Sequence, residues 1–196
     1  MTAAPQTAPT GPQIFRNGRA VAVRQVRADD IGLLTGFVAR LSARTCHQRY
    51  LAARSFTLAT ARAEAQRIAA ARTSRHIALV AVAPLFGNED LVGVAELVPM
   101  DGEAGVAELA AVVRDDMQGA GVGSLLMRAA LVAAPQLGVH TLHVELLADN
   151  DAMRRLAGQA GEPEVIGWAD GVLQLRVRLG AGATDRRRGP ALRRAA

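Results

Sequence analysis

Hydrophobic residues recur with two different periods along this chain, and the two periods divide it into strands and helices. Alternation of apolar and polar residues is typical of a half-buried strand, whereas apolar spacing of three and four is typical of a helix. Strand patterns occupy residues 19–27, 76–83, 91–98, 106–113, 140–147, 164–168 and 172–179. Helical patterns occupy residues 31–41, 122–137 and 150–160, and two more helices, separated near residues 55–57, lie within 41–71.

The order of these elements predicts one mixed sheet. The strands at 76–83, 91–98 and 106–113 follow one another across short polar turns, which favours an antiparallel meander. The strand at 140–147 follows a helix, so we expect it to lie parallel to 106–113. The sequence therefore predicts an α/β (α+β) fold with a mixed, mostly antiparallel central sheet flanked by helices.

A glycine-rich loop, Gln-Gly-Ala-Gly-Val-Gly at residues 118–123, joins the predicted strand 106–113 to the helix that begins at Val122. The first N–H groups of a helix have no partner within it, and the helix dipole places partial positive charge there. Glycines at 119, 121 and 123 allow positive φ and leave the backbone accessible to an anion. The loop therefore predicts a phosphate-binding site, although a glycine-rich turn that binds nothing has the same composition.

The spacing of the loop excludes two common phosphate motifs and is similar to a third. It lacks the G-x-G-x-x-G order of dinucleotide-binding folds and the G-K-[ST] of a P-loop. Gln-x-x-Gly-x-Gly, formed by Gln118, Gly121 and Gly123, resembles the acyl-coenzyme A signature of the GNAT N-acetyltransferase superfamily, and the element order over 19–179 resembles that of a GNAT domain. The resemblance implies acetyl-CoA as the acetyl donor. The cofactor-binding residues that it implies are Val112, Val113, Gln118, Gly119, Ala120, Gly121, Val122, Gly123, Ser124 and Asn150.

Glu108 is the candidate general base, because an amine must lose a proton when it is acetylated. Its neighbours on one strand face are small and apolar, which predicts a raised pKa. Ala107-Glu108-x-Ala110 also resembles the strand of protein-lysine acetyltransferases in which the glutamate is the base. A surface glutamate paired with an arginine is the alternative. Glu96 is the reserve candidate, and the four histidines are expected to pack or to be solvated.

The helix after Asn150 departs from the pattern of many GNAT enzymes. Those enzymes carry a tyrosine there that protonates the leaving thiolate, and here the segment reads Met-Arg-Arg-Leu-Ala at residues 153–157. Asn150 itself matches a cofactor-contacting asparagine of the family and is also a preferred helix N-cap residue. Protonation of the leaving group would then fall to water or to another residue.

The resemblance implies an N-acetyltransferase that moves an acetyl group from acetyl-CoA to a primary amine by direct attack in a ternary complex. The amino-acid sequence of residues 41–50 is similar to a segment of bacterial GNAT domains that acetylate protein lysines, which favours a protein lysine over a small-molecule amine as the acceptor. The alternative is a non-catalytic acyl-CoA-binding sensor or interaction module with a GNAT fold. The sequence leaves open the acceptor, the acyl chain length, whether the chain is active and whether it forms a homodimer.

Composition narrows the remaining classes of function. With 196 residues, the chain is long enough for one domain, here 19–179, and we expect residues 1–18 and the arginine-rich tail 180–196 to be disordered.

All 23 basic residues are arginines, but the net charge is only +5 and the tail supplies most of it, which argues against a nucleic-acid partner. No apolar run reaches the 18 or so residues of a membrane span, so we expect a cytoplasmic protein with no membrane partner. A single cysteine, Cys46, excludes an internal disulfide and a thiolate cluster, and no metal site is predicted.

Overall fold

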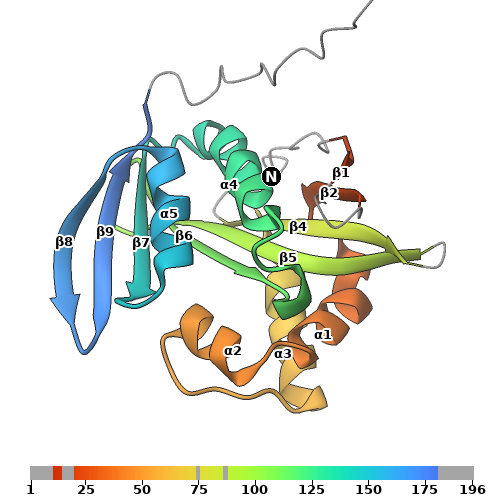
Figure 1. Ribbon diagram of the computed structural model, residues 1–196. Helices are drawn as coiled ribbons and strands as arrows, with labels where there is room; N and C mark the ends of the chain where they lie inside the picture. The colour runs from red at the N-terminus through yellow and green to blue at the C-terminus, as the bar shows by residue number, and fades with distance from the viewer. Residues whose placement is uncertain (1–10, 15–19, 74–75, 86–87, 181–196) are drawn as a thin grey trace, which may run out of the picture.

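The computed structural model describes residues 11–14, 20–73, 76–85 and 88–180, which form one sheet covered by helices on both faces (Figure 1). The sheet has nine strands, eight of them in the order β1-β2-β4-β5-β6-β7-β9-β8, with β3 paired to β4. The strands are β1 (Gln13–Ile14), β2 (Ala20–Gln25), β3 (Arg72–Thr73), β4 (His76–Leu85), β5 (Asn88–Pro99), β6 (Val106–Val113), β7 (Thr141–Leu147), β8 (Pro163–Ala169) and β9 (Val172–Arg178). All neighbouring pairs are antiparallel except β6 and β7. The predicted mixed, mostly antiparallel fold is thereby confirmed.

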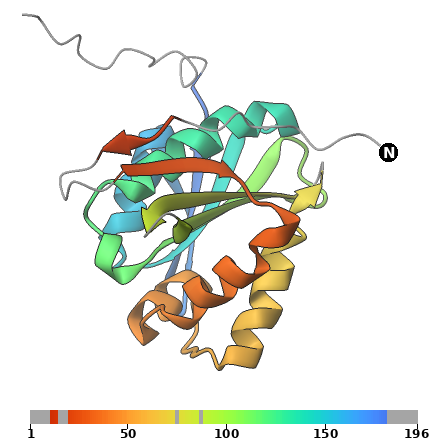
Figure 2. The ribbon, with the colours of Figure 1, turned by 90° about the vertical axis from the view of Figure 1, so that its right-hand side faces the viewer.

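The helices divide between the two faces of the sheet (Figures 1 and 2). One face carries α1 (Ile31–Ala39), α2 (Ala43–Tyr50) and α3 (Leu58–Ala69), and the other carries α4 (Val122–Ala133) and α5 (Asp151–Ala160). Three short 3-10 turns complete the helical segments of the described chain. Turn η1 (Ala28–Asp30) precedes α1, η2 (Asp115–Met117) precedes the glycine loop, and η3 (Ala134–Leu137) follows α4 directly. Within the described residues, no helix is long and apolar enough to cross a bilayer.

Alternation along the strands builds a separate hydrophobic core on each face. On β6, Ala107 and Leu109 pack in the larger core beneath α4, whereas Val112 packs in the smaller core beneath α1 and α3. Glu108 and Ala110 share the face of Val112, because successive side chains of a strand point to opposite faces. Alternating residues of β6 therefore face opposite sides of the sheet, and Glu108 lies on the side that carries α1 and α3.

The β6–β7 pair opens partway along its length, and this opening positions the site. The two strands pair in parallel only from Val106 with Thr141 to Glu108 with His143. Beyond Glu108, β6 continues to Val113 alongside β5, and β7 continues to Leu147 alongside β9. The end of β6 therefore separates from β7, and the glycine loop and the start of α5 lie at the resulting gap.

The structure differs from the predicted elements at the edges of the sheet. Strands β1 and β3 were not predicted, because two residues are too few to show a period. Gln13–Ile14 falls in a segment for which we predict disorder, and here antiparallel pairing with β2 satisfies its backbone groups. The rest of the predicted disorder falls at residues 1–10, 15–18 and 181–196, which lie outside the described residues. Strand β4 continues beyond the predicted end, through Pro84, where it pairs only with β5 among the described strands because its pairing with β2 ends at Val82. Proline has no N–H to donate, and it is tolerated here because one side of β4 has no described partner strand at this point.

Candidate active site

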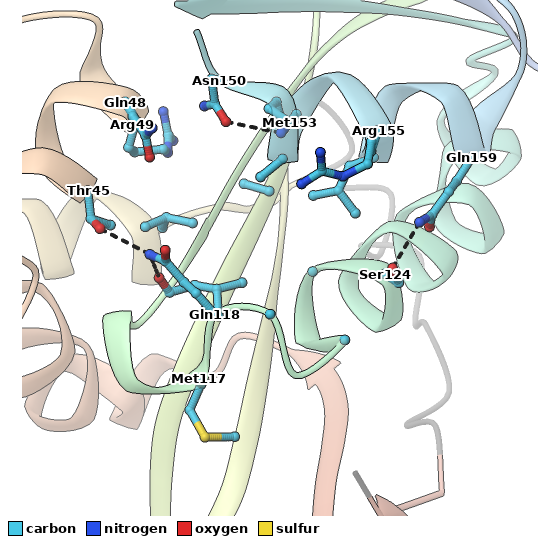
Figure 3. Close-up of a pocket in the computed structure, with 18 residues that line it drawn as sticks. Thr45, Gln48, Arg49, Met117, Gln118, Ser124, Asn150, Met153, Arg155 and Gln159 are labelled. Atoms are coloured by element: carbon cyan, nitrogen blue, oxygen red, sulfur yellow. Dashed lines mark hydrogen bonds between the residues drawn. The ribbon is translucent and has the colours of Figure 1, made fainter. Parts of the chain in front are cut away.

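A pocket of about 390 Å³ lies at the gap between β6 and α5 (Figure 3). The end of β6, the glycine loop, the first turn of α4, one side of α5 and one side of α2 line it. The predicted cofactor residues that line it are Val112, Val113, Gln118, Gly119, Gly121, Gly123, Ser124 and Asn150. The structure thus brings together most of the residues that the resemblance implies, while Ala120 and Val122 are not in the lining, and Val122 is buried in the core.

The glycine loop has the backbone conformation expected of an anion site. Gly119 and Gly121 have φ values of 73° and 101°, which a residue with a Cβ adopts only at a cost. Gly121 is the N-cap of α4 and supplies no side chain to bond the first N–H groups of the helix. Those N–H groups therefore remain available to a ligand at the positive end of the helix dipole.

Gly123, which lines the pocket, also has a packing role that the sequence did not predict. A Cβ at this position would lie 3.1 Å from Cδ1 of Leu156, so the glycine allows α4 and α5 to pack closely. Ser124 Oγ, one residue later, accepts a hydrogen bond from Gln159 Nε2 at 2.9 Å and joins the same two helices. This third glycine therefore supports the close packing of two helices that both contribute to the pocket lining.

The side chains of Gln118 and Asn150 are bonded within the protein (Figure 3). Gln118 Nε2 donates to Val113 O and to Thr45 Oγ1, each at 3.0 Å, which folds the loop back on the end of β6. Asn150 Oδ1 accepts from Met153 N at 3.0 Å and caps α5. The N-cap interpretation of Asn150 is thus confirmed, and its remaining amide donors lie at the pocket.

Asp115 anchors α2 to the loop that leads to the glycines. Its carboxylate accepts from Ser42 N at 3.0 Å and from Thr45 Oγ1 at 2.8 Å. Burial opposes ionisation, but the hydrogen bonds from Ser42 and Thr45 outweigh it and lower the pKa of Asp115. Since Thr45 also accepts from Gln118, one polar cluster holds the glycine loop and α2 together.

Arg155 is a candidate cofactor residue that sequence analysis missed. It projects from α5 at the pocket, and no acidic residue is among the residues that line this pocket (Figure 3). Its guanidinium forms no salt bridge within the described part of the chain, whereas its neighbour Arg154 pairs with Asp151. A basic residue in the second turn after Asn150 was the available signal, and only the structure shows which of two consecutive arginines faces the pocket.

A second pocket, of about 420 Å³, lies on the α1–α3 face and adjoins the first at Arg49, which lines both. Its floor is a buried carboxylate, Glu96, which is 3% exposed. Glu96 accepts hydrogen bonds from Arg49 at 2.6 Å, from Arg67 at 2.9 Å and from His76 at 3.0 Å. Burial alone would raise the pKa of Glu96, but the hydrogen bonds from His76 and Arg67 and the charges of Arg49 and Arg67 hold it far below its usual range. Such a carboxylate is a weak base, so the geometry favours a structural role for Glu96.

Removing the charge of Glu96 should destabilise the fold. Glu96→Gln leaves Arg49 and Arg67 without their shared partner, and we expect the free energy of unfolding at pH 7 to fall by about 3 kcal/mol. Because the folded-state pKa is depressed, this contribution is complete above the unfolded pKa of about 4.3 and is lost as pH falls below it. Urea denaturation at pH 7 and pH 3 measures this, and an equal difference between wild type and variant at both pH values would contradict the account.

Glu108 lies at the second pocket, but its environment differs from the predicted one. The side chain is exposed, and the pocket residues around it include Arg49, Arg54, Glu96 and Ala110. The expectation of apolar surroundings is therefore wrong, because the face that Glu108 shares with Ala110 borders a pocket that also carries charged side chains. The alternative of an arginine-paired surface residue also fails, since Glu108 forms no salt bridge with any described arginine.

The two pockets share Arg49, and their linings include consecutive residues of β6. Ala110 lines the second pocket and Ala111 lines the first, while Glu108 stands one strand repeat before Ala110. A ligand that reaches from the glycine loop along β6 would therefore end beside the pocket that holds Glu108. This arrangement suits transfer of a group from a phosphate-anchored donor to an acceptor on the other face.

A model of the family described as the acetyltransferase (GNAT) domain matches residues 21–162. That match covers well over half of the chain, which therefore belongs to the GNAT acetyltransferase family, as the glycine loop and the element order predict. Acetyltransferase Pat of Mycolicibacterium smegmatis is 45% identical over 58 residues, a segment that is 30% of this chain and 17% of that protein. This chain thus matches only a small part of that relative's length.

Solved structures with the same fold include the GNAT domain of S. lividans PAT, with a TM-score of 0.72 and 23% identity over 86% of this chain and 96% of that chain. A cAMP-binding acyltransferase from Mycobacterium smegmatis has a TM-score of 0.57 and 26% identity over 88% of this chain, but this is only 48% of that chain. YncA from Salmonella typhimurium, solved with its cofactor acetyl-CoA, has a TM-score of 0.57 and 19% identity over 82% of this chain and 95% of that chain. All three share the fold described above.

Acetyl-CoA is the acetyl donor of this family, and the first pocket fits it. The open amides after Gly121 and the guanidinium of Arg155 suit its phosphates, and no acidic lining residue opposes them. Ala111, Val112 and Met153 offer apolar lining along the end of β6 and the first turn of α5. The charge and the apolar lining of this pocket are therefore compatible with the donor.

Proposed function

We propose that this chain acetylates a primary amine by direct attack in a ternary complex, with Glu108 as the general base. The observation that carries the proposal is the adjacency of the two pockets, which share Arg49 and include Ala110 and Ala111 of β6 in their linings. The proposed cofactor residues are Val112, Val113, the backbone of residues 118–124, Asn150 and Arg155. Bound acetyl-CoA supplies an acetyl group activated as a thioester.

The chain's own residues then have separate tasks. The glycine loop and Arg155 fix the phosphates, and the β6 backbone directs the donor toward Ala110. Glu108 accepts the ammonium proton of the acceptor, directly or through one water, because its carboxylate is exposed at the acceptor pocket and forms no salt bridge with any residue that the structure describes. Glu96 keeps Arg49 and Arg67 in place on the floor of that pocket.

A protein lysine is the acceptor that we favour. The support is the sequence of residues 41–50, which form α2 and the two residues before it, and of residues 107–110 on β6. Both segments resemble bacterial GNAT domains that acetylate protein lysines. The similarity to Acetyltransferase Pat covers only 17% of that protein and supports acetyl transfer without identifying an acceptor. We also infer that 19–179 is the domain that carries this activity.

One observation supports the second candidate, a non-catalytic acyl-CoA sensor. Tyr50 is the single tyrosine of the chain, and its hydroxyl donates to Glu64 at 3.1 Å, away from the donor pocket. Burial and the charge of Glu64 raise the pKa of Tyr50 above its usual range, which makes it a poor acid. No tyrosine therefore replaces the one missing from α5, and a sensor would not need one.

Two-substrate kinetics distinguish the two functions. Release of free CoA is measured at several concentrations of acetyl-CoA against lysine peptides, polyamines and aminoglycosides, with mass spectrometry of the acceptor. Direct attack in a ternary complex predicts intersecting double-reciprocal lines and one added acetyl group on the amine. Parallel lines would indicate a covalent enzyme intermediate. Binding of acetyl-CoA without release on any acceptor would favour the sensor.

Arg155 should contribute to donor affinity through charge. We expect Arg155→Gln to weaken acetyl-CoA binding about threefold to tenfold at low ionic strength, because an exposed guanidinium–phosphate contact is modest and is screened by salt. Calorimetric titration at 20 and 300 mM NaCl measures the effect. Arg154→Gln is the matched control, since Arg154 is the neighbouring arginine outside the pocket lining. Equal losses in both variants would contradict the assignment.

A further inference from the structure

The second pocket carries six charged side chains, three arginines and three glutamates. Four of these charges are committed within the protein. Arg49 and Arg67 bond Glu96, and Arg67 also bonds Glu64 at 2.7 Å. The two that form no salt bridge within the described residues are Glu108 and Arg54.

Two aromatic rings hold Arg54 in place, and no carboxylate within the described ranges pairs with it. Its guanidinium carbon lies 4.7 Å from the ring centroid of Tyr50 and 4.7 Å from that of Phe56. The two rings are themselves in edge-to-face contact, with centroids 5.4 Å apart, and the Tyr50 hydroxyl is anchored on Glu64. Aromatic contacts of this kind orient a guanidinium and leave its N–H donors free for an anion.

Arg54 is also on the accessible side of the pocket. Its side chain is exposed, as is that of Glu108. The pocket therefore presents one available negative group, at the place where the acceptor amine is proposed to lie, and one available positive group on its wall. A simple amine would use only the first of these.

We infer that Arg54 forms an anion subsite of the acceptor pocket, and that the preferred acceptor is a primary amine that also carries a carboxylate. The inference rests on the proposed function, because Glu108 marks the position of the amine. The ammonium group meets Glu108 while the carboxylate accepts hydrogen bonds from the Arg54 guanidinium, a charge-assisted pairing for which arginine is suited. The same chemistry is present in an acidic residue near a protein lysine and in a small amino acid.

Matched acceptors test the subsite. One pair is a peptide with a single lysine and an aspartate two residues away, against the same peptide with asparagine; the other is 6-aminohexanoate against its neutral amide. For wild type we expect kcat/KM to be about tenfold higher for the carboxylate member of at least one pair, the order expected for an arginine–carboxylate contact. The pair that shows the preference identifies the source of the carboxylate.

Variants of exposed arginines assign the preference to its residue. Arg54→Gln should reduce the ratio within the pair to near one by raising KM for the carboxylate member, while kcat/KM for the neutral member stays the same. Arg54→Lys should retain part of the ratio. Arg62→Gln, an exposed arginine of α3 outside both pocket linings, should leave it unchanged. No carboxylate preference in wild type, or a preference that survives Arg54→Gln, would overturn the inference.

A binding measurement separates this inference from the proposed function. Fluorescence polarisation gives the affinity of the two labelled peptides for the protein saturated with CoA, whether or not transfer occurs. Tighter binding of the aspartate peptide that is lost in Arg54→Gln, without any transfer, would support the subsite and contradict the transferase. Equal binding of both peptides to wild type would contradict the subsite, even if both are acetylated.

Discussion

Replacement of Glu108 by Gln is expected to lower kcat about 100-fold or more while leaving the affinity for acetyl-CoA unchanged. A positioned general base contributes roughly this factor, and the amide of glutamine cannot accept the amine proton. Glu108 lines the acceptor pocket and is absent from the donor pocket lining, so the donor should not sense the change. Thiol release under saturating substrates gives kcat, and calorimetric titration gives the affinity.

The control for this variant is Glu164→Gln, which removes another exposed strand glutamate, on β8, outside both pockets. It should retain wild-type turnover. Raising the pH offers a second check, because a more alkaline solution deprotonates more of the amine without a base and should partly restore turnover in Glu108→Gln. If Glu108→Gln keeps wild-type turnover at neutral pH, Glu108 has no part in proton removal.

The second large effect is expected at Gly119. A valine there should weaken acetyl-CoA binding about 10-fold to 100-fold, because its side chain occupies the lining of the donor pocket and displaces the phosphate from the amides of the loop. The position has open space for a Cβ but a φ of 73°, so the variant also carries backbone strain. Calorimetric titration measures the affinity, and thermal unfolding measures the strain.

Gly102→Val separates the two contributions. Gly102 also has open space for a Cβ and a positive φ, 82°, in an exposed turn outside both pocket linings. Both valine variants should therefore lower Tm by similar amounts, whereas only Gly119→Val should lose affinity for acetyl-CoA. A comparable loss of affinity in Gly102→Val would mean that general destabilisation explains the result and that the loop is not the phosphate site.

The element order and the position of the glycine loop follow from the sequence, because they depend on local patterns. Long apolar periods mark the helices and strands, and glycines at 119 and 121 occur where a strand gives way to a helix, which is where the structure has positive φ. The parallel β6–β7 pairing also follows, since a helix connects the two strands. The placement of β9 between β7 and β8 does not, because it depends on contacts between distant segments.

The charge pairing in the acceptor pocket also depends on contacts between distant segments, so the sequence alone could not predict it. Glu96 gathers Arg49, Arg67 and His76 from three other elements, and no local pattern in the sequence shows that they converge. The prediction of small, apolar surroundings for Glu108 used its strand neighbours alone, whereas the charged residues of its pocket come from α2, α3, β5 and the loop between α2 and α3. The aromatic support of Arg54 likewise appears only when Tyr50 and Phe56 are placed in space.

The central claim is that the pocket at the end of β6 binds acetyl-CoA and delivers its acetyl group to an amine beside Glu108. Calorimetric titration of the purified protein with acetyl-CoA, followed by addition of lysine peptides and a thiol assay on the same sample, tests this most directly. We expect saturable binding of one acetyl-CoA per chain and release of free CoA only when an amine is present. Absence of binding would contradict the assignment of the 118–124 loop, and binding with no release on any amine would contradict the transferase function.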